Sequence, residues 1–326
     1  MRVKDLTKQY DGKTVVDSVS FEIPKGKVIS MIGPNGAGKS TVLNIISRLI
    51  ARDSGLVELG GGAVCLIDSG NDKDAGRKVR QLLDARGWKL SAIYNTHSNA
   101  DHTGGCQYLQ KQTGCRVFAP GIEAAFTRAP VLEPAFLFGG FPPKPLRHKF
   151  LMAQPAPAED VSAPGFPEGV DILPLPGHFF DMAGYRTPDG TAYIADCLSS
   201  AATLEKYGFP FIYDVGAYLE TLRRLPQLEA RLYVPAHAEA VEDIAPLAEL
   251  NLRHVEAICE AVLELCAEPT GFEELLKRVF DRWGLQLTME QYVLVGSTLK
   301  SILAWHLDAG RAEALVEQNR LLWRRV

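Results

Sequence analysis

The sequence lacks any uninterrupted apolar stretch that approaches the roughly 18 residues a membrane-spanning helix needs. It also lacks an apolar segment at its start, where MRVKDLTKQYDGK carries scattered charges, so neither secretion nor organelle import is predicted. Internal repeats and low-complexity tracts are absent. We therefore expect a cytoplasmic protein without a membrane span. A chain of 326 residues is long enough for two domains, or for one large domain with appendages.

The six cysteines form no CxxC pair and no spacing typical of a disulfide framework in a chain of this length. Small disulfide-stabilised proteins are therefore excluded as a class. Cys259 and Cys266 lie seven residues apart on a predicted helix, which places both side chains on one face. We predict that these thiols pack in the core and do not bind a metal.

The net charge of −4 is unevenly distributed. Residues 1–57 carry nine Lys and Arg against five Asp and Glu, a net charge of +4, so the rest of the chain carries −8. This shift indicates a boundary near residue 59. We expect three parts, over residues 1–59, 60–268 and 269–326.

Alternating strands and helices predict an α/β protein. In the first part, we predict strands at 3–6, 15–23 and 27–32 and a helix at 40–50. Further strands are predicted at 62–68, 90–95, 117–119, 171–174, 193–196 and 232–235, with helices at 73–86 and 121–126. Polar clusters follow several of these strands, and ligands at strand ends suit a layered α/β sandwich.

Prolines are dense between residues 129 and 167, and proline blocks both ladder hydrogen bonds and helix interiors. We predict a long loop there, either a lid beside the active site or a plain connection. From residue 244 onward the pattern is helical. It predicts helices at 251–266, 272–283 and 289–310, followed by a hairpin or strand at 314–323.

A phosphate-binding pattern, G-x-x-x-x-G-K-[ST], occurs in the first part as Gly33-Pro34-Asn35-Gly36-Ala37-Gly38-Lys39-Ser40, after an apolar strand and before a helix. Glycines allow backbone N–H groups to point at phosphate oxygens, the lysine supplies charge and the hydroxyl binds Mg²⁺. Together with the surrounding sequence, VSFEIPKGKVISMIGPNGAGKSTVLNIISRLIARDSG, this segment resembles the start of an ABC-transporter ATPase.

The ABC-transporter resemblance implies a site for ATP and Mg²⁺. In that site Tyr10 would stack on adenine, Lys39 would hold phosphate and Ser40 would bind Mg²⁺, with further contacts from Gly36, Gly38 and Thr41. Nothing after about Leu59 continues the family, because an acidic Walker B strand, an LSGGQ-type signature and a switch histidine are all missing. We therefore expect a truncated P-loop segment that does not hydrolyse ATP, and that either binds nucleotide or is a fusion remnant.

Two imidazoles and a carboxylate, His97, Asp101 and His102, lie within six residues after the strand predicted to end near residue 95. These are ligand types that Zn²⁺, iron and Mn²⁺ accept, and a rigid strand before them preorganises the loop. Three more such side chains, His178, Asp196 and His237, follow at later strand ends. The pattern predicts a metal centre, whereas His148, His254 and His306 are expected at the surface or in the core.

The series H-x-N-x-D-H at residues 97–102, followed in order by G-H, Asp and P-x-H, resembles the metallo-β-lactamase superfamily, whose first signature is H-x-H-x-D-H. Together with Leu66-Ile67-Asp68-Ser69-Gly70, the resemblance spans about residues 62–240. The resemblance implies an αββα sandwich and a metal-dependent hydrolase. It implies that His97 and His178 belong to one metal site and that Asp101, His102 and His237 belong to the other. Asp196 would bridge the two, and Asp68 would support the ligand loop.

Asn99 stands where the family usually has its second histidine, and its neutral amide oxygen is a poorer ligand than imidazole nitrogen. Three alternatives follow: one metal held by Asp101, His102, His237 and Asp196; two metals with Asn99 weakly coordinating; or iron or manganese in place of the zinc that we expect first. Elemental analysis would separate them.

The expected reaction is hydrolysis of a small-molecule substrate. A bound divalent cation lowers the pKa of its water toward about 7 and polarises the scissile bond. By resemblance, Asp101 would orient the attacking water or accept its proton. We expect a small ester, thioester, lactone or similar acyl substrate. The alternatives are a phosphodiesterase or ribonuclease, and an ATP-binding module related to ABC transporters.

Residues 269–326 resemble the winged-helix appendage of some metallo-β-lactamase-like hydrolases, several of which act on RNA. From Glu268 onward the chain carries eight Lys and Arg and eight Asp and Glu, so the basic surface of a nucleic-acid-binding region is missing. We expect this part to line the mouth of the active site or to form a homodimer interface.

Because the ABC-like segment occupies the place of the family's first strands, the sheet edge near residues 62–68 is expected to lack a neighbour.

Overall fold

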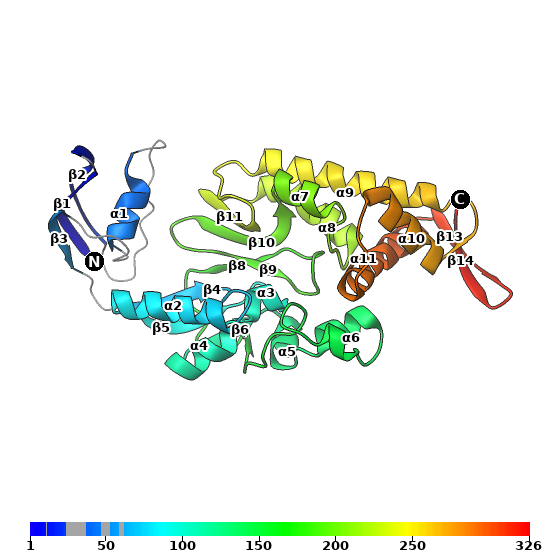
Figure 1. Cartoon of the computed structure of the whole chain (residues 1–326), viewed down its shortest axis with the longest axis horizontal. Coiled ribbons are helices and arrows are strands. Elements are labelled where there is room, and N and C mark those ends of the chain that lie inside the picture. Colours follow the sequence, from blue (N-terminus) through cyan, green and yellow to red (C-terminus); the bar gives the residue numbers. More distant parts are fainter. Residues whose placement is uncertain (11, 24–36, 47–52, 59–61) are drawn as a thin grey trace.

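A computed structural model describes residues 1–10, 12–23, 37–46, 53–58 and 62–326. Two four-stranded sheets form its centre, and helices cover their outer surfaces (Figure 1). The first sheet is parallel and contains, in order, β4 (Ala63–Ile67), β5 (Lys89–Tyr94), β6 (Arg116–Ala119) and β7 (Glu159–Asp160). The second has the order β11 (Leu232–His237), β10 (Thr191–Ser199), β9 (Ala183–Arg186) and β8 (Asp171–Pro174), and only its β10–β11 pair is parallel. The predicted αββα sandwich is confirmed.

The helices follow the sequence pattern in most places. They are α2 (Lys73–Arg86), α3 (Ala100–Thr103), α4 (Cys106–Thr113), α5 (Glu123–Arg128), α6 (Leu132–Phe138), α7 (Ala201–Tyr207), α8 (Val215–Arg224), α9 (Ala245–Leu265), α10 (Phe272–Trp283) and α11 (Met289–Asp308), with 3₁₀ turns at Lys144–Leu146 and Leu225–Gln227. The predicted bounds of α2 and α10 are confirmed. Asp72 caps α2 through bonds from two backbone N–H groups, and Gly87 ends it in the left-handed conformation.

Successive residues of β5 and β6 face opposite sides, as strand geometry requires. Ala92, Tyr94 and Phe118 point toward the second sheet, where they pack with Tyr185 of β9. On the other face, Ile93 and Val117 join the apolar cluster beneath α2 and α4. Burial on both sides explains why these strands are mainly hydrophobic.

The prediction of loop throughout residues 129–167 was wrong for α6 and for the 3₁₀ turn. Pro134 lies in the first turn of α6, where a backbone N–H has no helical partner, so proline does not break the helix there. Helices α3, α4, α7 and α8 and strand β9 were also not predicted.

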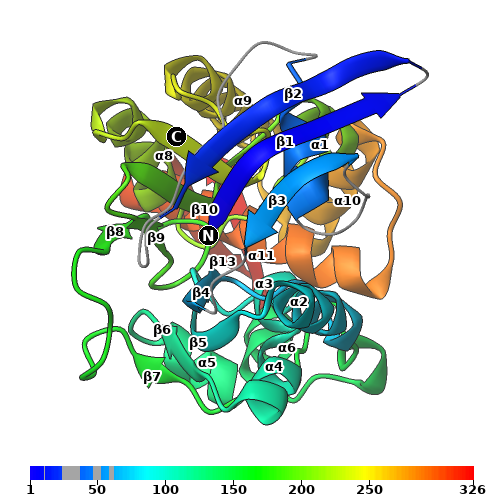
Figure 2. The same ribbon diagram turned by 90° about the vertical axis from the view of Figure 1, so that its left-hand side faces the viewer.

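The N-terminal part contains β1 (Arg2–Tyr10), β2 (Lys13–Glu22) and β3 (Ser54–Glu58) in an antiparallel sheet of order β2-β1-β3, and helix α1 (Lys39–Ile46). Figure 1 places this sheet at one end of the molecule, and Figure 2 shows its three strands side by side. Its core is separate and consists of Val3, Leu6, Val16, Val42, Ile45 and Ile46. The predicted strand at 27–32, residues 33–36 of the phosphate loop and the end of the predicted helix, 47–50, lie outside the described residues.

The C-terminal helices α10 and α11 pack in the same large core as β10 and α9, which includes Cys259 and Cys266. A small sheet of order β12-β14-β13 follows, made of β12 (Thr270–Gly271), β13 (Ala312–Glu317) and β14 (Arg320–Arg325). The predicted hairpin is therefore present. Its turn residues Gln318 and Asn319 both have positive φ, as in the tight turns that suit hairpins.

Strand β4 has one hydrogen-bonded neighbour, β5, among the described strands, so it forms an edge of its sheet, as expected. In the described part of the chain, no helix combines the length and apolar character that crossing a membrane requires.

Candidate metal centre

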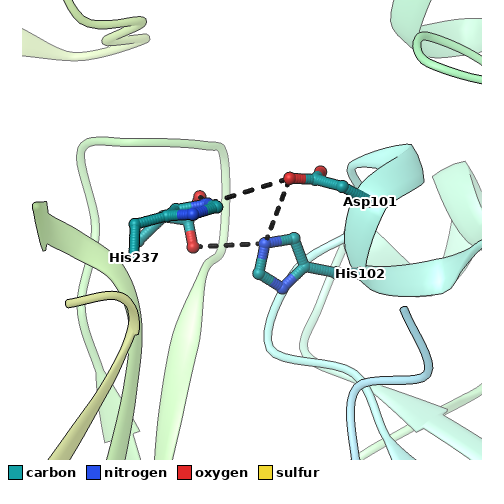
Figure 3. Close-up of side chains that lie close together, drawn as sticks. Asp101, His102 and His237 are labelled. Carbon is teal, nitrogen blue, oxygen red and sulfur yellow. Dashed lines mark hydrogen bonds and ion pairs between the residues drawn. The ribbon is translucent and has the colours of Figure 1, made fainter. Parts of the chain in front are cut away.

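Side chains from both sheets converge at one edge of the sandwich. Asp101 and His102 lie on α3, shortly after β5, and His237 is the last residue of β11. Figure 3 shows these three side chains pointing toward one another. One carboxylate oxygen of Asp101 lies 3.7 Å from His102 Nε2 and 3.8 Å from His237 Nε2. Donor atoms that each lie about 2.1 Å from a shared ion are at most about 4.2 Å apart, so these separations fit a common cation.

Asp196 of β10 lies at the centre of the cluster. His102 Nε2 is 3.1 Å from one of its carboxylate oxygens, and His237 Nε2 is 3.0 Å from the other. His178 Nε2 lies 3.7 Å from that second oxygen. The described residues thus contain two groups of ligand atoms lying within 4.8 Å of one another: Asp101, His102, Asp196 and His237, and His97, His178 and Asp196. Asp196 belongs to both groups.

His97 is fully buried, and its Nε2 atom has no hydrogen-bond partner in the structure. Its other nitrogen, Nδ1, is 3.0 Å from Thr96 Oγ1. Because the Thr96 hydroxyl donates its proton to Asp68, it must accept from His97 Nδ1–H. The lone pair of His97 is therefore on Nε2. A buried nitrogen with an unused lone pair, beside His178 and Asp196, fits a metal ligand.

Asp68 orients imidazoles of both groups. Its Oδ2 accepts from His102 Nδ1 at 2.8 Å and from Thr96 Oγ1 at 2.8 Å, and its Oδ1 accepts from the backbone N–H of Thr96. It fixes His102 directly and His97 through Thr96, so that each ring presents Nε2 toward the centre. This is the carboxylate–histidine arrangement that raises the basicity of metal ligands.

The backbone around the centre is tightly constrained. Asp68 has φ 58° and Ala195, directly before Asp196, has φ 49°, conformations that cost non-glycine residues about 1–3 kcal/mol each. Gly177, directly before His178, has φ 125°, and a Cβ there would lie 2.3 Å from the Tyr218 backbone. Gly104 packs against Asn71 in the same way. Strain and close packing of this kind are concentrated at functional sites.

Two buried acids beside the centre, Glu123 and Glu133, are not among the predicted site residues. Glu123 of α5 accepts hydrogen bonds from the N–H and hydroxyl of Ser98 and from the N–H of Asp181, so it ties the His97 loop to the loop that carries His178. Burial raises the pKa of Glu123 to about 7. No sequence pattern distinguishes this glutamate from an exposed one.

Glu133 of α6 is the second missed acid and is 6% exposed. The amide of Asn99 donates a hydrogen bond to it, and burial raises the pKa of Glu133 well above its usual range. The His97 group therefore has three members, and Asn99, which stands in the place of the family's second histidine, is paired with a buried glutamate. As with Glu123, no sequence pattern marks this glutamate as buried.

The pKa values of the four histidines shift in opposite directions in the two ligand groups. They are lowered for His97 and His178 and raised for His102 and His237. Burial lowers the pKa of His97 and of His178, which keeps these rings in the neutral form that binds metals. Burial also disfavours the charged form of His102, but the carboxylates of Asp196 and Asp68 outweigh it and raise that pKa well above its usual value. The hydrogen bond that His237 makes to Asp196 likewise raises the pKa of His237.

A cavity of about 300 Å³ lies directly beside the ligands, and Asp101, His178, Asp196 and His237 form part of its wall. Asp101 and His237 have side chains 51% and 42% exposed, so solvent reaches the centre from this side. His148, His254 and His306 lie outside both ligand groups, as expected.

The described P-loop residues lie at the start of α1. Gly38 has φ 78°, and Lys39, Ser40 and Thr41 form the first turn of the helix. Tyr10, at the end of β1, is 45% exposed and lies beneath the Lys8 ammonium. Gly36 lies outside the described residues.

Comparisons with known proteins match two parts of the chain to different families. The family model described as the metallo-beta-lactamase superfamily matches residues 48–237, more than half of the chain. A crystal structure of a metallo-beta-lactamase family protein from Thermus thermophilus is 21% identical, with a TM-score of 0.61, covering 80% of this chain and 89% of that one. A beta-lactamase domain protein from Burkholderia ambifaria is 17% identical, with a TM-score of 0.55, covering 82% and 83%. At these identities the two structures show the fold alone.

Curated relatives match the N-terminal part. A petrobactin import ATP-binding protein of Bacillus subtilis (strain 168) is 46% identical over 85 residues, which is 26% of this chain and 32% of that protein. A lantibiotic transport ATP-binding protein of Streptococcus pyogenes is 44% identical over 57 residues, 18% of this chain and 25% of that protein. The chain therefore spans about a third or less of the length of these curated relatives.

Proposed function

Because this chain belongs to the metallo-beta-lactamase superfamily and is a metal-dependent hydrolase, we propose that it cleaves a small ester, thioester or lactone at the centre around Asp196. The observation that carries the proposal is the meeting of two ligand groups at one carboxylate, that of Asp196, whose side chain is 9% exposed, beside a cavity. The site thus combines a place for cations with space for a small molecule.

In this proposal, His97, His178 and Asp196 hold one cation, and Asp101, His102, His237 and Asp196 hold the other. A cation bound there supplies a Lewis acid and makes water nucleophilic at neutral pH. Asp101 is half exposed at the cavity, where it can orient that water and accept its proton. Asp68 keeps the two histidine rings in the required tautomer.

Zinc is the first candidate for the cation, with iron and manganese as alternatives. The Asp101-containing group offers two imidazoles and two carboxylates, whereas the His97 group offers two imidazoles and one carboxylate. Asn99 is an additional oxygen donor for the His97 group only if its oxygen faces the cation while its NH₂ group binds Glu133. We therefore expect the Asp101 group to bind more tightly.

The test is to purify the protein without added metal and to measure metal content by elemental analysis. Hydrolysis of p-nitrophenyl acetate, a simple thioester and a lactone is then measured before and after chelation and after readdition of Zn²⁺, Mn²⁺ or Fe²⁺. Metal-dependent acyl hydrolysis supports the proposal. Cleavage of bis-p-nitrophenyl phosphate or single-stranded RNA, with none of the acyl compounds cleaved, would favour a phosphodiesterase instead.

A second candidate function, nucleotide binding, concerns the N-terminal part. It is supported by the similarity to ATP-binding proteins and by Lys39 and Ser40 at the start of α1. Isothermal titration with ATP and Mg²⁺ tests it directly. Binding that disappears in Lys39→Ala supports a nucleotide site, whereas no heat change with the unaltered protein rejects it.

A further inference from the structure

The cavity beside the metal centre is lined mainly by apolar and aromatic side chains away from the ligands. Leu204 and Tyr207 of α7 contribute, followed by Phe209 and Phe211 in the next segment. Leu294 and Val295 of α11 contribute from the C-terminal part of the chain. One cavity therefore extends from the ligand groups to the wall formed by α11.

Charge at the cavity wall is confined to the metal ligands. Among the described residues that line it, there is no Lys or Arg, and the polar groups beyond the ligands are neutral, such as Gln291 of α11. A phosphate or carboxylate group of a substrate would lose its hydration in the part of the cavity away from the ligands, and no cationic side chain there would pair with it. The wall therefore suits an uncharged, apolar group.

An aromatic contact joins the cavity to the metal centre. The ring of Phe211 lies edge-on to that of His178, with ring centroids 5.5 Å apart. A chain that lies against Phe211 would thus have its reactive end at the ligand groups. Tyr207 is 54% exposed at another point of the wall, so the cavity is accessible from solvent.

We propose that this cavity binds the apolar acyl chain of the substrate, and that α11 limits the length of that chain. The inference rests on the proposed acyl hydrolysis and names its substrate class: esters and thioesters with an uncharged, apolar acyl chain. The cavity, of about 300 Å³, has room for an acyl chain of several methylene groups beside the reacting ester. Medium-length acyl chains therefore fit best.

The reaction is an ordinary hydrolysis and needs no further reactant. The oxygen of water forms a bond to the acyl carbon, and the bond from that carbon to the alcohol or thiol breaks. The departing oxygen or sulfur takes a proton, and the acyl group leaves as a carboxylic acid. The apolar cavity contributes by holding the acyl chain so that its carbonyl lies at the ligands.

The experiment compares Leu294→Trp with Leu307→Trp. Both leucines lie on α11 and the substitution is the same, but Leu307 is an exposed residue, 39% accessible, and does not line the cavity. For each protein, kcat/KM is measured with p-nitrophenyl acetate, hexanoate, octanoate, decanoate and palmitate. We expect the unaltered protein and Leu307→Trp to prefer octanoate or decanoate over acetate by tenfold or more, and Leu294→Trp to lose at least tenfold of that preference.

A binding measurement separates failure of this inference from failure of the proposed function. Octan-1-ol is added to the metal-depleted proteins, and their melting temperatures are recorded. Octan-1-ol should raise the melting temperature of the unaltered protein and of Leu307→Trp, and raise it less in Leu294→Trp. Equal shifts in all three, no shift at all, or the same chain-length profile in both variants overturns the inference. If octan-1-ol binds in a way that depends on Leu294 but no ester is hydrolysed, the apolar binding site is supported and the proposed acyl hydrolysis is rejected.

Discussion

The metal centre and the N-terminal sheet differ in how each is stabilised. Around the centre, buried polar groups are paired across distant parts of the chain, as in the bonds from Thr96 and His102 to Asp68. In the N-terminal sheet, polar contacts such as Lys8–Asp53 lie at the surface, and six apolar residues form a separate core. Exposed ion pairs contribute at most about 1 kcal/mol each, whereas breaking a buried pair costs several times more.

A specific motif does not by itself show that a site is complete. The phosphate loop and the histidine series are both clear in the sequence. The described structure brings the histidine series together with its supporting carboxylates. For the phosphate loop, the partners that complete an ABC ATPase are missing from the sequence itself. Substitutions of the ligands should therefore have large effects on the metal centre, and substitutions in the N-terminal sheet should have small ones.

The largest effect is expected from His102→Ala, which removes a ligand that lies between Asp68 and Asp196. We expect loss of bound metal and a roughly thousandfold fall in hydrolysis, equivalent to about 4 kcal/mol. Elemental analysis and initial rates measure both, with circular dichroism to show that the variant is folded. Lys39→Ala is the control, with wild-type rate and metal content. Full metal content in His102→Ala would contradict the proposed ligand set.

A smaller effect, on stability, is expected from Glu123→Gln in the metal-depleted protein. The pKa of Glu123 in the folded protein is about 7, raised from 4.5, so the folded state holds this proton more tightly than the unfolded state does. Its contribution to stability is complete below pH 4.5 and is lost as the pH rises to about 7. At 1.36 kcal/mol per pKa unit, this amounts to about 3 kcal/mol.

Glutamine cannot titrate, so the stability of Glu123→Gln should not fall between pH 5 and pH 8 through this residue. The substitution itself should change the stability by the same amount at every pH. Urea unfolding of both proteins at pH 5 and pH 8 measures the difference. Glu249→Gln, at an exposed ion pair with Arg253, serves as the control. Parallel pH dependence in the unaltered protein and Glu123→Gln would show that Glu123 does not titrate in this range.

Asp68→Asn should weaken metal binding by about 10–100-fold while leaving the fold intact, because the carboxylate orients His102 and, through Thr96, His97. Competition with a chelator measures the affinity. Asp74→Asn, at an exposed ion pair with Arg77, is the matched control and should bind metal normally. Equal affinities of the two variants would mean that the orientation of these rings is fixed by packing alone.

The smallest effect at the centre is expected from Leu6→Ala, in the separate N-terminal core. Leu6 and Leu109 are both fully buried, but Leu109 lies in the cluster beneath α2 and α4. Each substitution removes about 2–5 kcal/mol from its own core. Leu6→Ala should leave metal content and hydrolysis within about twofold of wild type, whereas Leu109→Ala should reduce the thermal stability of the metal-binding region. Loss of metal in Leu6→Ala would show that the two regions depend on each other.

The amino-acid pattern alone was enough to predict the sandwich, the bounds of α2 and α10, and the candidate ligands. Periodicity and caps act locally, as in α2, and the ligands follow strands whose ends are marked by polar clusters. It also indicated the departure at Asn99.

The surroundings of those ligands depend on how distant segments pack in the folded chain. Glu123, Glu133 and the wall of α11 reach the centre from segments that are distant along the chain, and whether a glutamate is buried depends on those segments. Helix α6 was also not predicted, because Pro134 is compatible with a helix only in its first turn, where the structure places it. The preference of a segment for helix or strand depends on neighbouring residues in the sequence, but burial and the pairing of charges depend on the folded chain.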